Sequence, residues 1–336
     1  MAPHANMGPI ESGTLSSARG IAISATGISK AYRGVPAVES LDLEVAAGSV
    51  LGFLGPNGAG KTTAIRILST MLTPDAGAFM IAGVPHTRAL EIRRRTGVLP
   101  ESAGYPSAQT ALEWLTYHGS LFGASSDVAR DRAVQLLSEV GLADRGRSRI
   151  SGFSRGMRQR LGIARALVHH PEVVFLDEPT LGLDPAGQQQ VLDIVANLAR
   201  EHGVTVVLST HALAEVEQLC NRVVIIHRGR VVADGTVAEI VHRSAVPLRG
   251  SVLVPPEMRE HAVEVLAAQR IAARAPLHDH PDEIAFTLPS DASTEQASTM
   301  VLRCLLDVGV PVLGFAIERG RLTDAFAALT TEERHG

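Results

Sequence analysis

The segment at residues 50–68 reads VLGFLGPNGAGKTTAIRIL and divides into three parts. Residues 50–54 are a short apolar run, typical of a buried strand, and residues 64–68 continue as a helix. Between them, residues 55–62 match the pattern Gly-x-x-x-x-Gly-Lys-Ser/Thr of a phosphate-binding loop. Because strand, loop and helix follow in the order that this pattern requires, we expect an α/β domain that binds a nucleotide here.

Lys61, inside this loop, is an unusual residue for this chain. The sequence contains only two lysines against 29 arginines. A compact ammonium on a flexible stem can fold back over phosphates inside a tight loop, where a planar guanidinium does not fit as well. The N-terminus of the following helix adds partial positive charge. We therefore expect the loop, the helix and Lys61 to act together on one phosphate group.

Size and charge restrict the class of protein. A chain of 336 residues can hold one large and one smaller domain. A net charge of -4 and a pI near 6.4 provide no overall attraction to nucleic acid, whose binding proteins usually carry a basic face. Arginines cluster at residues 93–95 and 145–165, and we interpret both clusters as solvated faces. No nucleic-acid partner is expected.

The cysteines and the first residues favour the cytoplasm. Cys220 and Cys304 lie far apart without a CxxC pattern, so neither a disulfide framework nor a zinc site is expected. Residues 1–20 lack the apolar stretch of a signal peptide and are expected to form a flexible leader. No uncharged apolar run approaches the roughly 20 residues that span a bilayer. We therefore expect a soluble chain without a transmembrane segment.

The order of segments predicts a large α/β domain at residues 21–240. Short apolar strands alternate with helices there, the pattern of a mainly parallel sheet. Strand signals vanish at about residues 102–168, which predicts a helical subdomain with helices at residues 111–122, 128–140 and 156–169.

A smaller α+β domain is expected after a linker at residues 241–250. Residues 251–330 show the order βαββαβ, which predicts a ferredoxin-like fold. The final helix, at residues 322–329, is expected to pack back on the body of the protein.

Residues 173–178 (VVFLDE) predict a buried strand that ends in two acids. Neighbouring side chains of an extended chain diverge, so one of the two acids can approach Mg²⁺ while the other addresses a water near the γ-phosphate. Alone, the pair would be an ordinary strand end with solvated charges. Because a phosphate-binding loop precedes it in the chain, we interpret it as part of the same site.

Three further motifs complete the pattern. Residues 153–157 (FSRGM) place a serine and a glycine at the entry to a helix, residues 181–184 read LGLD, and His211 follows an apolar strand. The five motifs, in this order and spacing, resemble the ATP-binding cassette (ABC) family over about residues 21–240. The resemblance implies a P-loop ATPase core with a helical subdomain that uses ATP and Mg²⁺.

The resemblance also implies residue roles. Lys61 contacts the β- and γ-phosphates, Glu178 positions or deprotonates the attacking water and His211 touches the γ-phosphate, so these three are the implied catalytic residues. Thr62 and Asp177 are the implied magnesium ligands, the latter through the ion's shell. The residues implied to bind nucleotide are Tyr32, Gly55, Pro56, Asn57, Gly58, Ala59, Gly60, Lys61, Thr62, Thr63, Glu101, Ser154, Gly156 and Asp184.

Two of these roles have ordinary alternatives. The chain contains 13 histidines, and a lone histidine such as His211 is often structural or solvated. Tyr32 is implied to stack on adenine, as aromatic side chains do on nucleic-acid bases, but could otherwise be a simple surface aromatic. The position of His211 after a strand and the motif around Tyr32 favour the functional interpretations.

Ser154 and Gly156 indicate a partner. They supply a hydroxyl and a close backbone at a helix N-terminus, which favours an anion. In the ABC family this site meets the nucleotide on the opposite subunit. The resemblance therefore implies a homodimer that closes on ATP and drives a separate integral-membrane permease from the cytoplasmic side of the cell membrane.

The chain departs from the usual family pattern at two positions. Residues 153–157 read FSRGM rather than LSGGQ, and Glu101 stands where a glutamine is usual. Both departures, the small C-terminal domain and the ending LTDAF at residues 322–326 are similar to exporter ATPases of the daunorubicin-resistance type. A carboxylate at Glu101 binds magnesium more strongly than an amide but repels the γ-phosphate, so its role is either ion contact or coupling.

We therefore expect the ATP-hydrolysing subunit of an ABC exporter for drug, antibiotic or lipid-like cargo. One alternative is a non-transport ABC ATPase acting on nucleic acid or ribosomes, which would need coiled-coil insertions or a second cassette. Another is an importer subunit, which the cassette alone does not exclude. The histidine groups at residues 169–170 and 278–280 lack the further ligands of a metal site. No residue is assigned to cargo.

Overall fold

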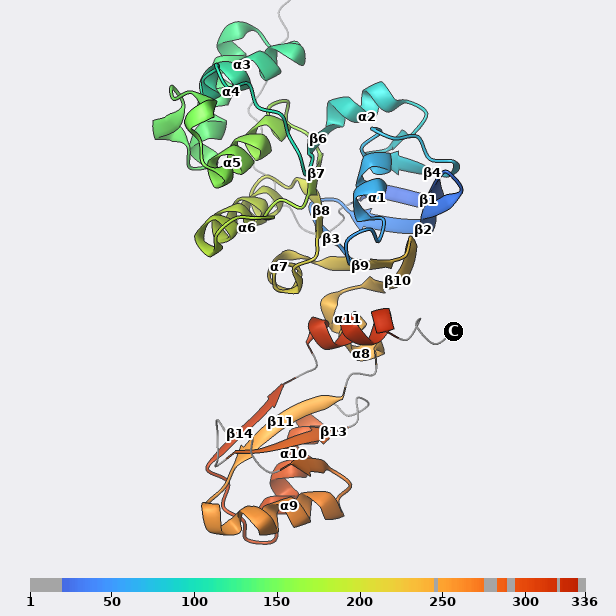
Figure 1. Ribbon diagram of the computed structural model, residues 1–336, viewed down its shortest axis with the longest axis vertical. Helices are drawn as coiled ribbons and strands as arrows, with labels where there is room; N and C mark the ends of the chain where they lie inside the picture. The colour runs from blue at the N-terminus through green and yellow to red at the C-terminus, as the bar shows by residue number, and fades with distance from the viewer. Residues whose placement is uncertain (1–19, 245–246, 275–282, 289–293, 319–320, 332–336) are drawn as a thin grey trace, which may run out of the picture.

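The computed structural model describes residues 20–244, 247–274, 283–288, 294–318 and 321–331. The expected leader therefore lies outside the described residues except for Gly20, as does the histidine group at residues 278–280. Figure 1 shows a larger N-terminal part and a smaller C-terminal part below it.

A six-stranded sheet carries the phosphate-binding loop. Its order is β10-β9-β3-β8-β7-β6, and all neighbours run parallel except β10 and β9. All residues of β3, β7 and β8 are buried, as expected for apolar strands covered on both faces. The expected parallel sheet is confirmed. Its strands are β3 Val50–Leu54, β6 Thr96–Leu99, β7 Val173–Asp177, β8 Thr205–Thr210, β9 Arg222–His227 and β10 Arg230–Gly235.

Helices fill the connections between these strands. The loop after β3 leads directly into α1, and the connections after β7 and β8 contain α6 and α7. Because parallel strands need such crossovers, their carboxyl ends all meet at one edge of the sheet. The helices are α1 Lys61–Leu68, α2 Ala89–Arg95, α6 Pro185–Arg200 and α7 Leu213–Leu219.

A second sheet, which is antiparallel, was not expected. Its order is β2-β1-β4-β5, with β1 Ile21–Tyr32, β2 Val35–Ala46, β4 Ala76–Ile81 and β5 Val84–Pro85. The prediction of one mainly parallel sheet was wrong for these residues. In β2 the side chains of Leu41, Leu43 and Val45 are buried while their neighbours are exposed. This alternation is typical of a sheet with one solvated face.

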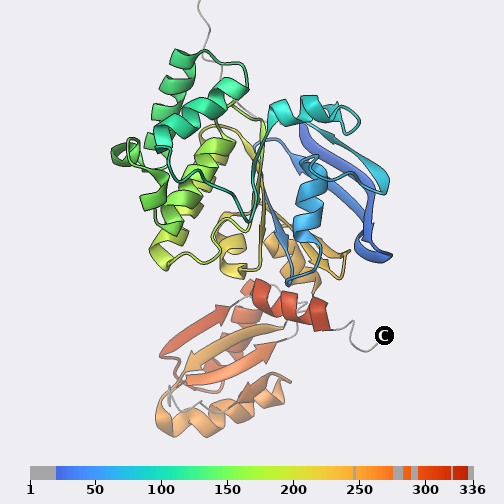
Figure 2. The same ribbon diagram turned by 45° about the horizontal axis from the view of Figure 1, so that its top comes forward.

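Three helices at residues 111–166 are confirmed with small shifts at their ends. They are α3 Ala111–Leu121, α4 Ser126–Glu139 and α5 Arg155–Ala166, joined by short 3₁₀ turns at Ala143–Arg145 and Ile150–Gly152. A reciprocal pair of hydrogen bonds between Thr110 and Glu113 caps α3. In Figure 2 these green helices stand on one side of the central sheet and the blue antiparallel sheet on the other.

The C-terminal sheet has the order β12-β13-β11-β14, and every pair is antiparallel. With a helix after the first and the third strand, this is the expected ferredoxin-like fold. Its elements are β11 Leu248–Leu253, a 3₁₀ turn at Pro256–Met258, α9 Arg259–Ala268, β12 Ala272–Arg274, β13 Glu283–Leu288, α10 Thr294–Leu306 and β14 Gly314–Glu318.

The segment expected to be a linker is mostly regular structure. Helix α8 spans Val237–Arg243, and β11 already begins at Leu248. The expectation of a linker over residues 241–250 was therefore too long at both ends. Thr236 and Glu239 cap α8 reciprocally, which explains why a helix begins there.

The final helix, α11 Leu322–Thr331, packs against the N-terminal part, as expected. Leu322 and Ala325 are fully buried in a cluster that includes Leu54 and Val216. The backbone N–H of Leu322 donates to Oε1 of Glu217 in α7 at 2.9 Å. Figures 1 and 2 both draw α11 between the two parts of the molecule.

Candidate functional site

The phosphate-binding loop lies at the carboxyl end of β3 and needs glycine for its shape. Gly58 and Gly60 have φ values of 81° and 113°, in the region that glycine adopts without strain. A Cβ atom on Gly60 would lie 2.2 Å from the carbonyl oxygen of Ala37. The loop can therefore close tightly and turn its backbone N–H groups toward a ligand.

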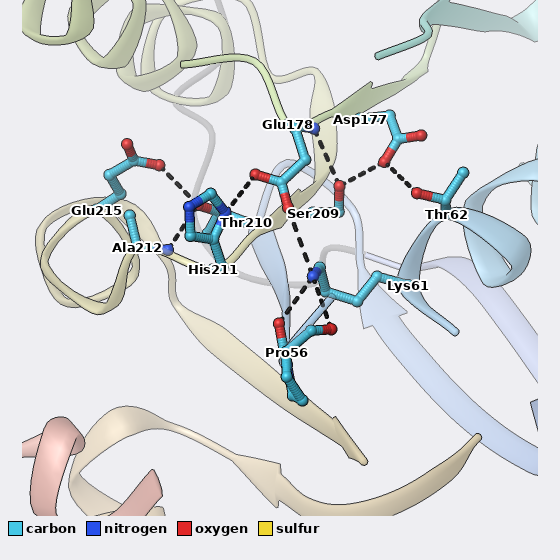
Figure 3. A network of polar contacts seen from close by, with 11 residues as sticks. Pro56, Lys61, Thr62, Asp177, Glu178, Ser209, Thr210, His211, Ala212 and Glu215 are labelled. Atoms are coloured by element: carbon cyan, nitrogen blue, oxygen red, sulfur yellow. Dashed lines mark hydrogen bonds and ion pairs between the residues drawn. The ribbon is translucent and has the colours of Figure 1, made fainter. Parts of the chain in front are cut away.

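Lys61 is folded back inside this loop. Its side chain is only 6% exposed, and its Nζ donates hydrogen bonds to the carbonyl oxygens of Gly55 at 2.7 Å and Pro56 at 3.3 Å. The ammonium also lies 3.4 Å from Oε1 of Glu178 (Figure 3). The first residue of α1 thus joins the loop to the acid at the end of β7.

Asp177 faces the start of α1. Its Oδ1 accepts hydrogen bonds from Oγ1 of Thr62 at 3.0 Å and from Oγ of Ser209 at 2.6 Å. Asp177 is 2% exposed and Ser209 is fully buried. A carboxylate and a hydroxyl this close together are oxygen donors of the kind that Mg²⁺ prefers.

Ser209 was not singled out from the sequence as a site residue. Besides donating to Asp177, its Oγ accepts the backbone N–H of Glu178 at 3.0 Å. The register of the sheet places Ser209 directly beside Asp177. A polar residue at the carboxyl end of the strand between the loop and the acids is the signal that would have found it.

Glu178 has a left-handed backbone, with φ of 49°. The two acids do point apart, but the extended geometry assumed for them was wrong at this residue. A non-glycine residue in this region costs about 1–2 kcal/mol, and such strain is typical of functional sites. The turn directs Oε1 of Glu178 to Lys61 and Oε2 to Nδ1 of His211, at 2.9 Å (Figure 3).

His211 follows β8, directly after Thr210, which forms a buried hydrogen-bonded pair with Glu215. Oγ1 of Thr210 donates to Oε2 of Glu215 at 2.9 Å and accepts the backbone N–H of Ala212 at 3.0 Å. Thr210 is fully buried and Glu215 is 7% exposed. The sequence offered a weak signal for this pair, since Glu215 is an acid on a short helix immediately after His211.

A pocket of about 380 Å³ joins the phosphate-binding loop to Glu178 and His211, while Asp177 lies outside its lining. Lys61 lines it, and so does Glu101, from the segment after β6. The lining also includes His211 and Leu181. The remaining lining residues are Ala37, Asn57, Gly58, Ala59, Gly60, Thr62 and Thr63.

A larger hollow of about 610 Å³ lies elsewhere, and we do not regard it as the nucleotide site. Glu172 and Thr205, at the amino ends of β7 and β8, line it together with Arg132 and Glu139 of α4. Ligands of open α/β sheets bind outside the carboxyl ends of the strands. The smaller pocket is at that end.

Six of the residues implied to bind nucleotide lie outside the lining of the pocket: Gly55 and Pro56 at the start of the loop, and Tyr32, Ser154, Gly156 and Asp184. Tyr32 ends β1 opposite Val35 and is 45% exposed. Ser154 caps α5 by accepting the N–H of Met157 at 3.2 Å, and Asp184 caps α6 by accepting that of Gly187 at 3.0 Å.

Gly156 is close to the segment before α6. A Cβ atom on Gly156 would have a side-chain atom of Leu183 as its nearest neighbour, at 3.9 Å. Ser154, Gly156 and Asp184 therefore gather at the starts of α5 and α6. Within one chain they form a group separate from the lining of the pocket.

The residues in and beside the pocket are those that define one class of protein. A glycine-rich loop, its lysine and threonine, and two acids from a neighbouring parallel strand define a P-loop nucleotide-hydrolysing protein. The family model described as ABC transporter matches residues 38–181. The chain belongs to the ATP-binding proteins of ABC transporters and is an ATPase that uses ATP.

Relatives match nearly the whole chain. It is 38% identical over 93% of its length to the daunorubicin resistance ATP-binding protein DrrA3 of Streptomyces coeruleorubidus, covering 97% of that protein. It is 34% identical over 93% of its length to the doxorubicin resistance ATP-binding protein DrrA of Mycobacterium tuberculosis, covering 94% of that protein. Among solved structures, the dimeric bacterial ABC transporter cassette MJ0796 matches with 25% identity and a TM-score of 0.59, over 64% of this chain and 98% of that one.

Proposed function

We propose that this chain is the ATP-hydrolysing subunit of an exporter and drives a separate permease from the cytoplasmic side of the cell membrane. The observation that carries the proposal is the similarity to drug-resistance ATP-binding proteins, which extends through the C-terminal ferredoxin-like sheet. In the described ranges, every helix is too short or too polar to cross a bilayer. A drug-like or antibiotic cargo fits the names of these relatives.

We propose that Thr62 and Asp177 hold Mg²⁺ with the nucleotide. The hydroxyl and the carboxylate are buried and 3.0 Å apart, which suits a small cation that keeps waters and phosphate oxygens among its ligands. Magnesium would supply neutralisation of phosphate charge. Ser209 holds the other side of the same carboxylate oxygen and keeps Asp177 turned toward Thr62.

Hydrolysis would follow from the positions of Lys61, Glu178 and His211. The ammonium of Lys61 neutralises charge on the β- and γ-phosphates. Glu178 orients the attacking water and accepts its proton as the bond from the water oxygen to the γ-phosphorus forms and the bond to the β-phosphate oxygen breaks. His211 lies close to the γ-phosphate, and its Nδ1, 2.9 Å from Oε2 of Glu178, keeps that carboxylate aligned.

The separate group at Ser154, Gly156 and Asp184 supports a dimer. Backbone N–H groups at the start of α5 favour an anion, but this group does not line the pocket of its own chain. In a two-fold arrangement it would face the nucleotide of the second copy. The solved structure of the related cassette MJ0796 is dimeric, which supports a homodimer that closes on ATP.

Glu101 is proposed to couple the nucleotide site to the permease. It lines the pocket and is exposed, so it can respond both to the γ-phosphate charge and to a partner. A carboxylate near that phosphate adds repulsion that an amide would not.

Tyr32 is proposed to stack on adenine, and its removal should weaken binding selectively. Tyr32→Ala should raise the Kd for ATP by roughly 5- to 150-fold, the equivalent of about 1–3 kcal/mol for an aromatic face on a base. Tyr32→Phe keeps the ring and should bind like the wild type. Calorimetry with Mg-ATP and with inorganic triphosphate distinguishes a loss of base stacking from a general loss of phosphate binding, because only ATP contains a base. An equal loss for both ligands would remove Tyr32 from the adenine site.

The exporter proposal is tested by identifying the partner. A tagged Glu178→Gln chain, captured with ATP from gently solubilised cells, should bring down a polytopic membrane protein in near-equal amount by mass spectrometry. The same capture without ATP is the control for adventitious membrane protein. Ribosomal proteins or nucleic acid in place of a permease would favour the non-transport alternative. A permease sequence of importer type would overturn the direction of transport.

A further inference from the structure

Thr210, Ala212 and Glu215 form a small network whose purpose none of the roles above explains. The hydroxyl of Thr210 donates to the carboxylate of Glu215 and accepts the backbone N–H of Ala212, at 2.9 and 3.0 Å. A threonine hydroxyl that bonds the N–H two residues later closes a turn. His211 is the residue at the centre of that turn (Figure 3).

The carboxylate makes the turn rigid. A hydroxyl has one proton to donate and lone pairs to accept with. Since Glu215 takes the proton, the oxygen of Thr210 presents a lone pair to Ala212, and a bond to a charged acceptor is stronger than a neutral one. Thr210 is fully buried, so water does not compete for these bonds.

The imidazole itself is less confined. The His211 side chain is 49% exposed, and Nδ1 bonds Oε2 of Glu178, whose side chain is 9% exposed. The orientation of the ring toward Glu178 therefore depends on the backbone that carries it. That backbone is tied to Glu215, which is buried in the first turn of α7.

We propose that Thr210 and Glu215 are positioning residues that hold His211 against Glu178 during ATP hydrolysis. This inference rests on the role proposed above for His211. Without the hydroxyl the turn opens, and the ring spends less time in contact with Glu178. The phosphate-binding loop is untouched, so kcat falls while the affinity for ATP stays close to its original value.

The test begins with Thr210→Val, which keeps the shape of the side chain and removes its hydroxyl. We expect kcat to fall roughly five- to twentyfold, the effect of losing one or two hydrogen bonds, with KM for ATP changed less than about twofold. Thr210→Ser restores the hydroxyl and should recover most of the lost rate. Glu215→Gln keeps a hydrogen-bond acceptor but removes its charge, so its kcat should lie between those of Thr210→Val and Thr210→Ser. It serves as the second variant if Thr210→Val does not fold.

A double-mutant cycle with His211→Ala separates positioning from general damage. If Thr210 acts through His211, Thr210→Val should change kcat less than about twofold once His211 is absent. Thr236 provides a matched control, because its hydroxyl accepts the N–H of Glu239 at 3.2 Å on α8. Thr236→Val should lower the melting temperature without changing kcat.

Two outcomes would contradict different claims. An equal loss of kcat from Thr210→Val with and without His211 overturns the positioning inference and leaves the proposed function intact. Wild-type kcat in His211→Ala alone instead overturns the role proposed for His211, on which the inference depends.

Discussion

Glu178→Gln should bind ATP with wild-type affinity and hydrolyse it roughly 10²- to 10⁴-fold more slowly, the usual loss when a general base is removed. The amide keeps the size of the side chain, and Lys61 still has the carbonyl oxygens of Gly55 and Pro56 as partners. ATP binding therefore survives while the water loses its proton acceptor. The proposed dimer closes on ATP and opens on hydrolysis, and this proposal predicts that the variant accumulates as an ATP-bound dimer, visible by size-exclusion chromatography with light scattering.

Ser209 supplies a contrast to this variant. Ser209→Ala removes a bond to Asp177 and one to the backbone of Glu178, but both acids remain. A dimer that appears with Glu178→Gln and not with Ser209→Ala would be a property of the lost carboxylate. Unchanged turnover in Glu178→Gln would remove Glu178 from the mechanism.

Lys61→Arg should lower ATPase activity severely although it keeps the positive charge. The ammonium sits 6% exposed within 2.7 Å of one loop carbonyl, and a planar guanidinium does not fit that space. The value of kcat/KM for ATP should fall roughly 10²- to 10³-fold, as it does when an enzyme loses one preorganised hydrogen-bond donor that stabilises charge in the transition state. Steady-state phosphate release measures it.

The chain contains its own control for this substitution. Lys30, the only other lysine, is paired with Asp75 at 2.5 Å on the antiparallel sheet. Lys30→Arg should retain the ion pair and leave phosphate release within about twofold of the wild type, since an exposed ion pair contributes little to stability. Equal losses at Lys30 and Lys61 would show a general intolerance of arginine and not a phosphate role.

The parts of the molecule that the sequence predicted well are those whose signal is local. The phosphate-binding loop and the acids at the end of β7 each lie within one short segment, and the strands around them are apolar at nearly every position. The C-terminal order βαββαβ was also recognised, because each strand and helix there has its own period.

The antiparallel sheet was missed although part of its signal is present. The pairing of β1 with β2 shifts register at several points, including between Ala25 and Ile28, which interrupts the alternation of buried and exposed residues in β1. In β2 the alternation is unbroken over residues 40–46 and was overlooked. The extended backbone assumed for Glu178 failed for a different reason. Its left-handed turn is held by bonds to Ser209, from a strand that lies next to it only in the folded sheet.

The same limit applies to Ser209, whereas Thr210 and Glu215 lie only five residues apart in one segment. Whether a hydroxyl at the end of β8 reaches Asp177 depends on the register between two strands, which no pattern within either strand specifies. The roles of the individual residues stay predictions until the variants above are measured.

The position of α11 affects when the ATPase part can finish burying its apolar surface during synthesis. Leu54 and Val216 belong to the ATPase part, yet the cluster that buries them also needs Leu322 and Ala325. During synthesis, that apolar surface is open until the ribosome has passed the final helix. If synthesis stalls after the ATPase part, the nascent chain exposes an apolar surface beside α7. Chaperones and proteases recognise exposed apolar surface of this kind in incompletely folded proteins.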